Sequence, residues 1–225
     1  MEFNDSLIKK YLSRDLEKEI EEENQMKELF QIVMLDLGFP PSDTLFPKEM
    51  KYILDLYSSY NGNNNELLKE EITNFLIGCY NEKELNILLQ YWEKQIICQN
   101  RIHILREAIQ GHIMGLYNLT VPTMLSQIEG IIAEGYNHVG HMTVKIQKQY
   151  ISDLLSCTDT GSFDSTINEY FLNTILVGFE HGKEIKSDLS RHAILHGADT
   201  SFGTQINSLK CILVFDYLLY NLKEV

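Results

Sequence analysis

The chain has few of the features that mark secreted, membrane-spanning or metal-binding proteins. Its four cysteines lie far apart and form no Cys-x-x-Cys pair, which argues against a zinc knuckle and against a disulfide framework. No apolar run approaches the roughly 20 residues that a membrane-spanning helix needs. The N-terminus has no basic stretch that leads into an apolar one. We therefore expect a cytoplasmic protein with no membrane partner, no metal and no cofactor.

Sustained alternation of apolar and polar residues, which marks β-strands, is also missing, whereas apolar residues recur at helical spacing along most of the chain. The sequence therefore predicts an all-α fold, a helical bundle of about eight or nine helices. The predicted helices cover residues 5–38, 47–60, 66–80, 81–117, 120–135, 142–156, 164–181, 187–197 and 204–223.

Some of these boundaries carry specific signals. Asn81 and Glu84 have the spacing of a capping box, and the helix that they begin is expected to be the longest, with a break allowed inside it. Thr120 and Pro122 are expected to open a helix. The last helix is apolar on nearly every face, as expected of an element at the centre of a bundle. Asp216 interrupts it, and its expected partner is Arg191, Lys210 or a remote hydroxyl, since a buried charge needs one.

The composition changes near residue 98. This change divides the chain into an N-terminal helical region of unknown role, 1–98, and a second helical domain, 99–225, unless the two form one continuous body. The formal net charge of −13 disfavours binding of nucleic acid over the whole surface. The charge is uneven, however, because residues 15–24 are densely acidic. The basic side chains of the C-terminal half leave room for a local basic groove: they are Lys145, Lys148, Lys183, Lys186, Arg191 and Lys210.

The segment 187–197 holds the residues best suited to chemistry. Ser187 is expected to cap a short helix and Gly197 to end it, so that Arg191, His192 and His196 lie on one rigid element. RNA can be cut without a metal if one group accepts the proton of the 2′-hydroxyl, a second donates a proton to the leaving oxygen, and a cation stabilises the charge on phosphorus. Histidine and arginine are the side chains that supply these functions near neutral pH.

This pattern resembles the HEPN superfamily of bacterial defence and toxin ribonucleases. In that family an arginine and a histidine separated by four to six residues lie before the final helix, and they mark a metal-independent endoribonuclease that works as a homodimer. Arg191, His192 and His196 match the motif, and residues 122–130 resemble uncharacterised members associated with abortive infection. The resemblance covers about residues 100–225. It implies an RNA substrate, a homodimer, and an antitoxin or nucleotidyltransferase partner in phage defence or a toxin system.

The resemblance makes Arg191 and His196 the catalytic residues. His192, Lys210 and Glu129 are the phosphate-binding or auxiliary candidates; for Glu129, an ordinary surface carboxylate is the main alternative. Arg106 and His112 form a second match with five residues between them, and we interpret them as ordinary polar residues of a helix.

Other interpretations of the same residues stay open. Arg191 and the histidines could simply be cations drawn to a helix C-terminus and to Asp188. His192 and His196 have the spacing of two zinc ligands with His181 as a third, although Ala193 stands where metalloproteases have glutamate. For the whole chain, the alternative is a non-catalytic helical dimer that acts as a protein-interaction or sensor module.

Overall fold

The computed structural model describes residues 16–40, 42, 44–156 and 163–222. Within these residues the chain is all-α, as predicted, with ten α-helices and no strand. The α-helices are α2 (Leu16–Asp36), α3 (Pro47–Ser59), α4 (Glu66–Cys79), α5 (Glu82–Trp92), α6 (Ile102–Ile113), α7 (Tyr117–Gly135), α8 (Val144–Ser156), α9 (Phe163–Tyr170), α10 (Arg191–Leu195) and α11 (Gln205–Asn221). A 3-10 turn, η1 (Ile96–Cys98), precedes α6, and a π-helical turn, η2 (Phe171–Ile175), continues α9.

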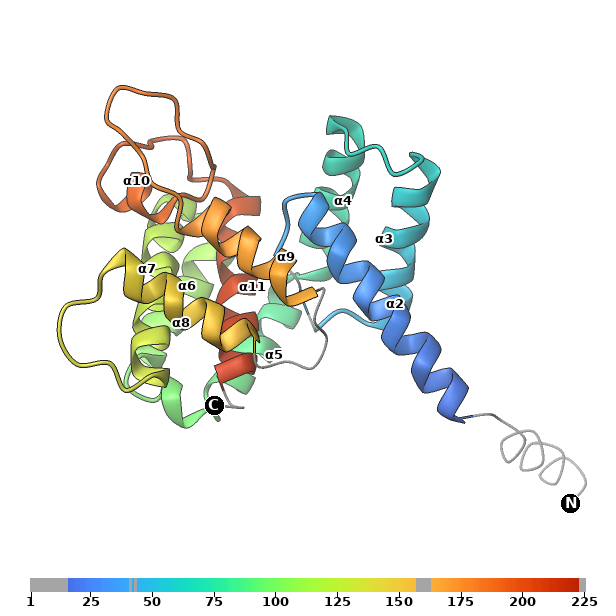
Figure 1. The fold of residues 1–225 in the computed structure, drawn as a ribbon, viewed down its shortest axis with the longest axis horizontal. Helices are drawn as coiled ribbons and strands as arrows, with labels where there is room; N and C mark the ends of the chain where they lie inside the picture. Colours follow the sequence, from blue (N-terminus) through green and yellow to red (C-terminus); the bar gives the residue numbers. More distant parts are fainter. Residues whose placement is uncertain (1–15, 41, 43, 157–162, 223–225) are drawn as a thin grey trace, which may run out of the picture.

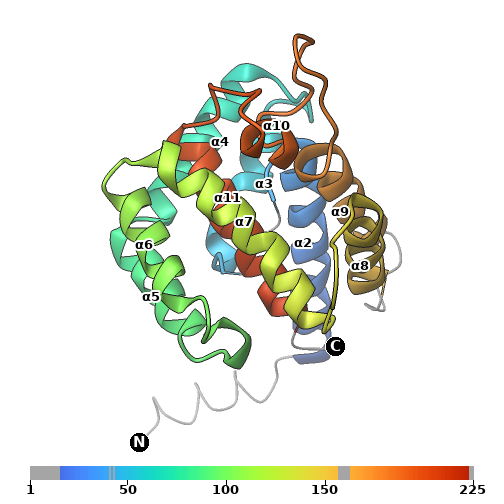
Figure 2. The same ribbon diagram turned by 90° about the vertical axis from the view of Figure 1, so that its left-hand side faces the viewer.

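The bundle is organised around α11. Figure 2 shows α7 lying across α11 in the centre, with α5 and α6 on one side and α8 and α9 on the other. In Figure 1, α2, α3 and α4 stand together on the opposite side of α11 from α7 and α8. The short helix α10 sits against α7 in both views. This arrangement places the motif helix beside the central pair of helices.

The prediction that the last helix lies at the centre is confirmed. Every residue of α11 from Asn207 to Leu219 is buried, including two charged side chains, Lys210 and Asp216. One contiguous cluster of buried side chains runs from Phe30 in α2 to Leu222 after α11. Side chains from both sides of residue 98 therefore share one hydrophobic core, which is the main source of stability in a helical bundle.

The helix starts that carry an asparagine cap were predicted well. Asn65 Oδ1 accepts a hydrogen bond from the Leu68 amide at 2.9 Å, and Asn81 Oδ1 accepts from the amides of Lys83 and Glu84 at 3.0 and 3.3 Å. These bonds satisfy amides that have no partner inside the helix. The helices therefore begin within one residue of the predicted positions.

Three predicted helices outside the motif segment differ from the structure. The helix over 81–117 contains the break that was allowed for, after Trp92, so that α5 and α6 are separate. The expectation that it is the longest helix is wrong, because α2 is the longest among the described residues. The helix expected to open at Thr120 and Pro122 begins earlier, at Tyr117, and Pro122 lies inside it. The helix over 164–181 ends with the π-helical turn at Ile175, and the chain from 176 to 190 is irregular.

The first predicted helix and the cysteines are only partly covered by the described residues. Residues 5–15 of the first predicted helix, and Cys157, lie outside the described residues. Cys79, Cys98 and Cys211 are not joined in a disulfide bond within the described residues. No helix within the described ranges is both long and apolar enough to cross a membrane.

Candidate functional site

The motif helix α10 begins and ends with sharply defined caps. The Ser190 side chain accepts a hydrogen bond from the Ala193 amide at 3.2 Å and is the N-cap. Ser187, the predicted cap, instead accepts from the Leu189 amide at 3.2 Å. Gly197 follows the helix with φ +72° and ends it as predicted, because glycine adopts this conformation without steric cost. The helix is therefore shorter than expected, and Arg191 is its first residue.

Two serine hydroxyls fasten this helix to the irregular chain that follows α9. Ser187 Oγ donates to the Thr174 carbonyl and Ser190 Oγ donates to the Val177 carbonyl, both at 2.9 Å. Thr174 lies in the π-helical turn η2, and Val177 follows it, where regular helical hydrogen bonding has ended. Interruptions of this kind often occur at functional sites. Ser190 thus caps α10 and anchors it with the same hydroxyl.

Arg191 does not project freely into solvent. Its guanidinium forms an ion pair with the Glu129 carboxylate of α7, and the two side chains are only 15% and 25% exposed. Of the two interpretations of Glu129, the structure supports a carboxylate aimed at the motif arginine rather than a solvated one. A partly buried pair of this kind fixes the orientation of the guanidinium. Arg191 Nε is buried and has no hydrogen-bond partner among the described residues.

The two histidines lie side by side next to this pair. The ring centroids of His192 and His196 are 6.3 Å apart, with an interplanar angle of 16°. His196 is exposed at the C-cap of α10, and the Phe179 ring stacks against it at 6.0 Å. His192 is half-buried, and its Nε2 has no hydrogen-bond partner among the described residues. Arg191, His192, His196 and Glu129 are called the motif cluster below.

The protonation of His192 follows from its surroundings. Burial lowers the pKa of His192, and electrostatic interactions with Arg191, His196 and Lys148 lower it further, against the opposing effect of Glu129. At neutral pH this imidazole is therefore neutral and can accept a proton. The cationic guanidinium of Arg191 stands beside it, so the cluster combines a proton acceptor with a phosphate-binding group.

Lys210 belongs to a neighbouring ion pair. Its ammonium lies 3.3 Å from the Asp188 carboxylate and 5.1 Å from the centre of the Phe39 ring. Asp188 was one expected partner of Arg191, but it pairs with Lys210 instead. Lys210 can therefore contact a phosphate group only when the exposed Asp188 carboxylate moves away from it.

The second arginine–histidine match does not form a site. Arg106 is exposed and its Nε lies 2.8 Å from the Glu93 carboxylate. His112 is only 5% exposed, and its Nδ1 lies 2.8 Å from Ser208 Oγ. Burial lowers the pKa of His112 to about 4, so the ring is neutral and enclosed. His112 is a core residue, and the interpretation of it as an ordinary polar helix residue is wrong in that respect.

The described residues include no group of three or more His, Cys, Asp or Glu side chains placed to hold a metal ion. His181 contacts the Phe179 ring edge-on at 4.9 Å, so it shares an aromatic neighbour with His196. The zinc interpretation needs three convergent ligands, and the structure does not bring His181, His192 and His196 into such a set.

Asp216 has an indole partner that was not among those predicted. Its Oδ1 accepts a hydrogen bond from the indole Nε1 of Trp92 at 2.7 Å, and both residues are buried. Neither Arg191 nor Lys210 is that partner. The indole N–H offsets the cost of burying the carboxylate, and it joins α5 to α11 across 124 residues of sequence.

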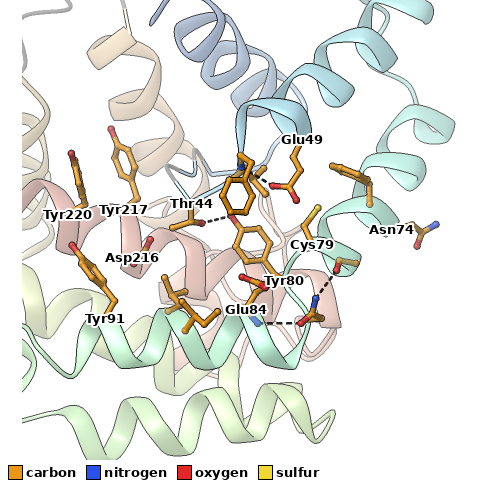
Figure 3. Close-up of a pocket in the computed structure, with 17 residues that line it drawn as sticks. Thr44, Glu49, Asn74, Cys79, Tyr80, Glu84, Tyr91, Asp216, Tyr217 and Tyr220 are labelled. Atoms are coloured by element: carbon orange, nitrogen blue, oxygen red, sulfur yellow. Dashed lines mark hydrogen bonds between the residues drawn. The ribbon is translucent and has the colours of Figure 1, made fainter. Parts of the chain in front are cut away.

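Sequence reasoning missed a second feature, a cavity of about 860 Å³ between α3, α4, α5 and α11. Asp216 lies in its wall, together with several tyrosines (Figure 3). Tyr80 is part of that wall, and its hydroxyl is hydrogen-bonded to the hydroxyls of Ser42 and Thr44. The number of tyrosines, 12, was the only available signal, and it gave no position. The cavity and the motif cluster share no residue.

Comparisons of the chain with protein-family models, with curated proteins and with solved structures find no match.

Proposed function

We propose that this chain is a metal-independent endoribonuclease of HEPN type, which cleaves RNA by attack of the 2′-hydroxyl on the adjacent phosphorus. The observation that carries the proposal is the motif cluster itself. An arginine oriented by a partly buried carboxylate stands next to a neutral histidine and to an exposed one. Those are the groups that metal-free phosphodiester cleavage requires.

Each residue has a distinct role in this proposal. His196, the exposed ring at the end of α10, is the general acid or base that exchanges a proton with the RNA. Arg191 binds the phosphate oxygens and stabilises the negative charge that builds on them in the transition state. His192 contacts phosphate or tunes His196. Glu129 holds the guanidinium in place, and Lys210 is an auxiliary cation.

The reaction balances without an added reagent. The 2′-oxygen loses its proton to a base and forms a bond to phosphorus, the bond from phosphorus to the 5′-oxygen breaks, and that oxygen takes up a proton. The products carry a 2′,3′-cyclic phosphate and a 5′-hydroxyl. One protomer holds one motif cluster, and a two-fold homodimer would place two clusters across one groove, which supplies both an acid and a base.

Unused hydrogen-bonding capacity at the cluster supports the proposal. Arg191 Nε and His192 Nε2 are both buried without a partner among the described residues. Buried polar atoms are nearly always satisfied, and those that are not tend to lie at sites with a function. A phosphate group that binds beside Arg191 and His192, while Glu129 still holds the guanidinium, would supply acceptors to this region.

The test is cleavage of a mixed RNA pool in the presence of EDTA, followed on a denaturing gel. Wild type should cut, whereas Arg191→Ala and His196→Ala should each lose activity by roughly 10²–10⁴-fold, the usual contribution of such groups. Arg106→Ala is the matched control, because it removes the arginine of the second match and should cut like wild type. A His196→Ala protein that cuts as fast as wild type would refute the proposal.

A second candidate function is a non-catalytic helical dimer that serves as a protein-interaction or sensor module. The net charge of −13 favours it, and so does an Arg191 guanidinium already occupied by Glu129. Salt separates the two functions, because RNA affinity that depends on phosphate contacts falls steeply as salt rises. An interaction module should show no RNA affinity at low salt. With either function, the resemblance implies that the protein acts in the cytoplasm, in phage defence or a toxin system, with an antitoxin or a nucleotidyltransferase as its partner.

A further inference from the structure

The cavity between α3, α4, α5 and α11 has the dimensions of a small-molecule site. Its volume of about 860 Å³ lies within the usual range of ligand pockets, which is roughly 300–1,000 Å³. Three of its lining side chains are exposed although they are apolar or aromatic: Phe46 is 68%, Ile87 49% and Tyr220 48% exposed. The cavity therefore opens to solvent where these side chains lie, and a ligand can enter without unfolding the bundle.

The charge of the cavity wall has one sign. Glu49, Glu84 and Asp216 line it, and the described lining includes no lysine, arginine or histidine. Asp216 is the most enclosed of the three, at 8% exposure, and it is the carboxylate that the Trp92 indole holds in place. A wall of this kind repels anions and attracts cations, and the attraction is stronger than the same carboxylates would exert in bulk water because the surroundings are partly apolar.

Aromatic rings gather around the same carboxylate. Figure 3 shows Tyr91, Tyr217 and Tyr220 grouped with Asp216 at one end of the cavity, while Glu49, Cys79 and Asn74 lie toward the other end. Electron-rich rings around a carboxylate form the environment in which proteins bind organic ammonium groups. The remaining wall, which includes Leu45, Phe75 and Leu88, suits an apolar ligand body.

From this size, charge and aromatic content, we infer that the cavity binds a small organic cation, with its ammonium group at Asp216 and the tyrosines and its apolar body along α4 and α5. The inference is independent of RNA cleavage, because no lining residue belongs to the motif cluster. It adds a ligand site to a region of the chain, 44–91, for which the motif predicts no function.

The probes are three molecules with the same carbon skeleton and different head groups: phenylbutylamine, phenylbutanol and phenylbutyrate. Near neutral pH these are a cation, a neutral alcohol and an anion. Trp92 is the only tryptophan of the full chain and is bonded to Asp216, so its fluorescence reports on occupation of this end of the cavity. Isothermal titration on the same samples gives the affinities.

The amine should bind saturably and change the Trp92 emission, whereas the alcohol should bind on the order of tenfold more weakly and the anion more weakly still, as expected for loss of a charge-assisted contact. Asp216→Asn keeps an oxygen that can accept from Trp92 but removes the charge, and it should weaken binding of the amine by about tenfold or more. Asp55→Asn is the control, because Asp55 is exposed on α3 and does not line the cavity.

A second variant tests the location of the site without touching Asp216. Gly78 lines the cavity on α4, and a Cβ added there would meet no atom within 4 Å. Gly78→Phe should therefore fold, since glycine is the weaker helix former, while its ring obstructs the cavity and abolishes amine binding. Equal affinities for amine and alcohol, tighter binding of the anion, unchanged amine binding by both variants, or no saturable amine binding by wild type would overturn the inference.

Discussion

The buried histidine of α6 makes the stability of the protein depend on pH in a calculable way. His112 is 5% exposed, and burial lowers its pKa to about 4 from an ordinary value of 6.5. Above pH 6.5 the ring is neutral in both the folded and the unfolded chain, so its full contribution to stability is present. Between pH 6.5 and about 4 the unfolded chain binds a proton that the folded chain does not, and stability falls as the pH falls.

The size of this effect follows from the difference in pKa. At 1.36 kcal/mol per pH unit, a lowering from 6.5 to about 4 corresponds to about 3 kcal/mol of unfolding free energy lost between neutral and acidic pH. His112→Asn removes the titrating ring and keeps a group that can bond to Ser208. The variant should be less stable at neutral pH because it leaves a small void. Its disadvantage relative to wild type should shrink by about 3 kcal/mol toward pH 4.

Urea unfolding of both proteins across this pH range measures the effect, because the groups that they share cancel in the difference between them. His103→Asn is the matched control: His103 lies on the same helix but is exposed. A difference between wild type and His112→Asn that stays constant with pH would refute the reasoning. So would a wild-type advantage that grows on acidification.

Three further variants or measurements test other parts of the structure. Ser190→Ala should cost about 1–2 kcal/mol in urea unfolding, because it removes the N-cap of α10 and leaves the Val177 carbonyl without its donor, whereas Ser190→Thr should restore most of the loss. Trp92→Phe should cost about 3 kcal/mol or more, since it shrinks a buried ring and removes the indole donor from Asp216; a loss below about 1 kcal/mol would show that this bond is unimportant. Burial and a neighbouring glutamate raise the pKa of Cys79 to about 11, so mass spectrometry should find slow alkylation of this thiol at neutral pH and faster alkylation in urea. Rapid labelling of the folded protein would contradict that environment.

The fold class and most helix starts could be predicted because they depend on local signals. The side chains of Asn65 and Asn81 accept hydrogen bonds from backbone amides two or three residues later in the chain, so these caps can be recognised from the sequence alone. A break in the helix over 81–117 was allowed for, but its position after Trp92 could not be predicted, because no glycine or proline marks it. Packing of α5 and α6 against each other decides it, and tertiary contacts routinely override helix propensity.

The motif cluster was predictable in its members and only partly in its geometry. Arg191, His192 and His196 lie within one short segment, so their proximity followed from the sequence. Ser187 and Ser190 are equally good caps by composition, and both hydroxyls donate to carbonyls of the segment after α9, so the sequence does not show that Ser190 caps the helix. The pairing of Arg191 with Glu129 required the packing of α10 on α7.

Contacts between distant parts of the chain were beyond prediction. The indole that donates to Asp216 lies 124 residues away in the sequence, and nothing in the pattern of a single sequence points to Trp92. The cavity depends on four helices and a connecting segment at once. Such features depend on how side chains from distant parts of the chain pack together. A functional site could therefore be predicted at the motif, whose residues are close in the sequence, but not at the cavity.

The burial of α11 on all sides also bears on when the protein can fold during synthesis. Helices α2 to α10 leave the ribosome before α11, yet α4, α6 and α7 all pack against it. Until residues 205–221 emerge, these helices face a core that lacks its central element, and their apolar sides stay open to solvent. The motif helix is anchored next to this late-arriving element. Asn207 and Lys210 of α11 contact Asp188, just before the motif helix, so we expect the arginine and the two histidines to reach their final positions only after α11 has been synthesised.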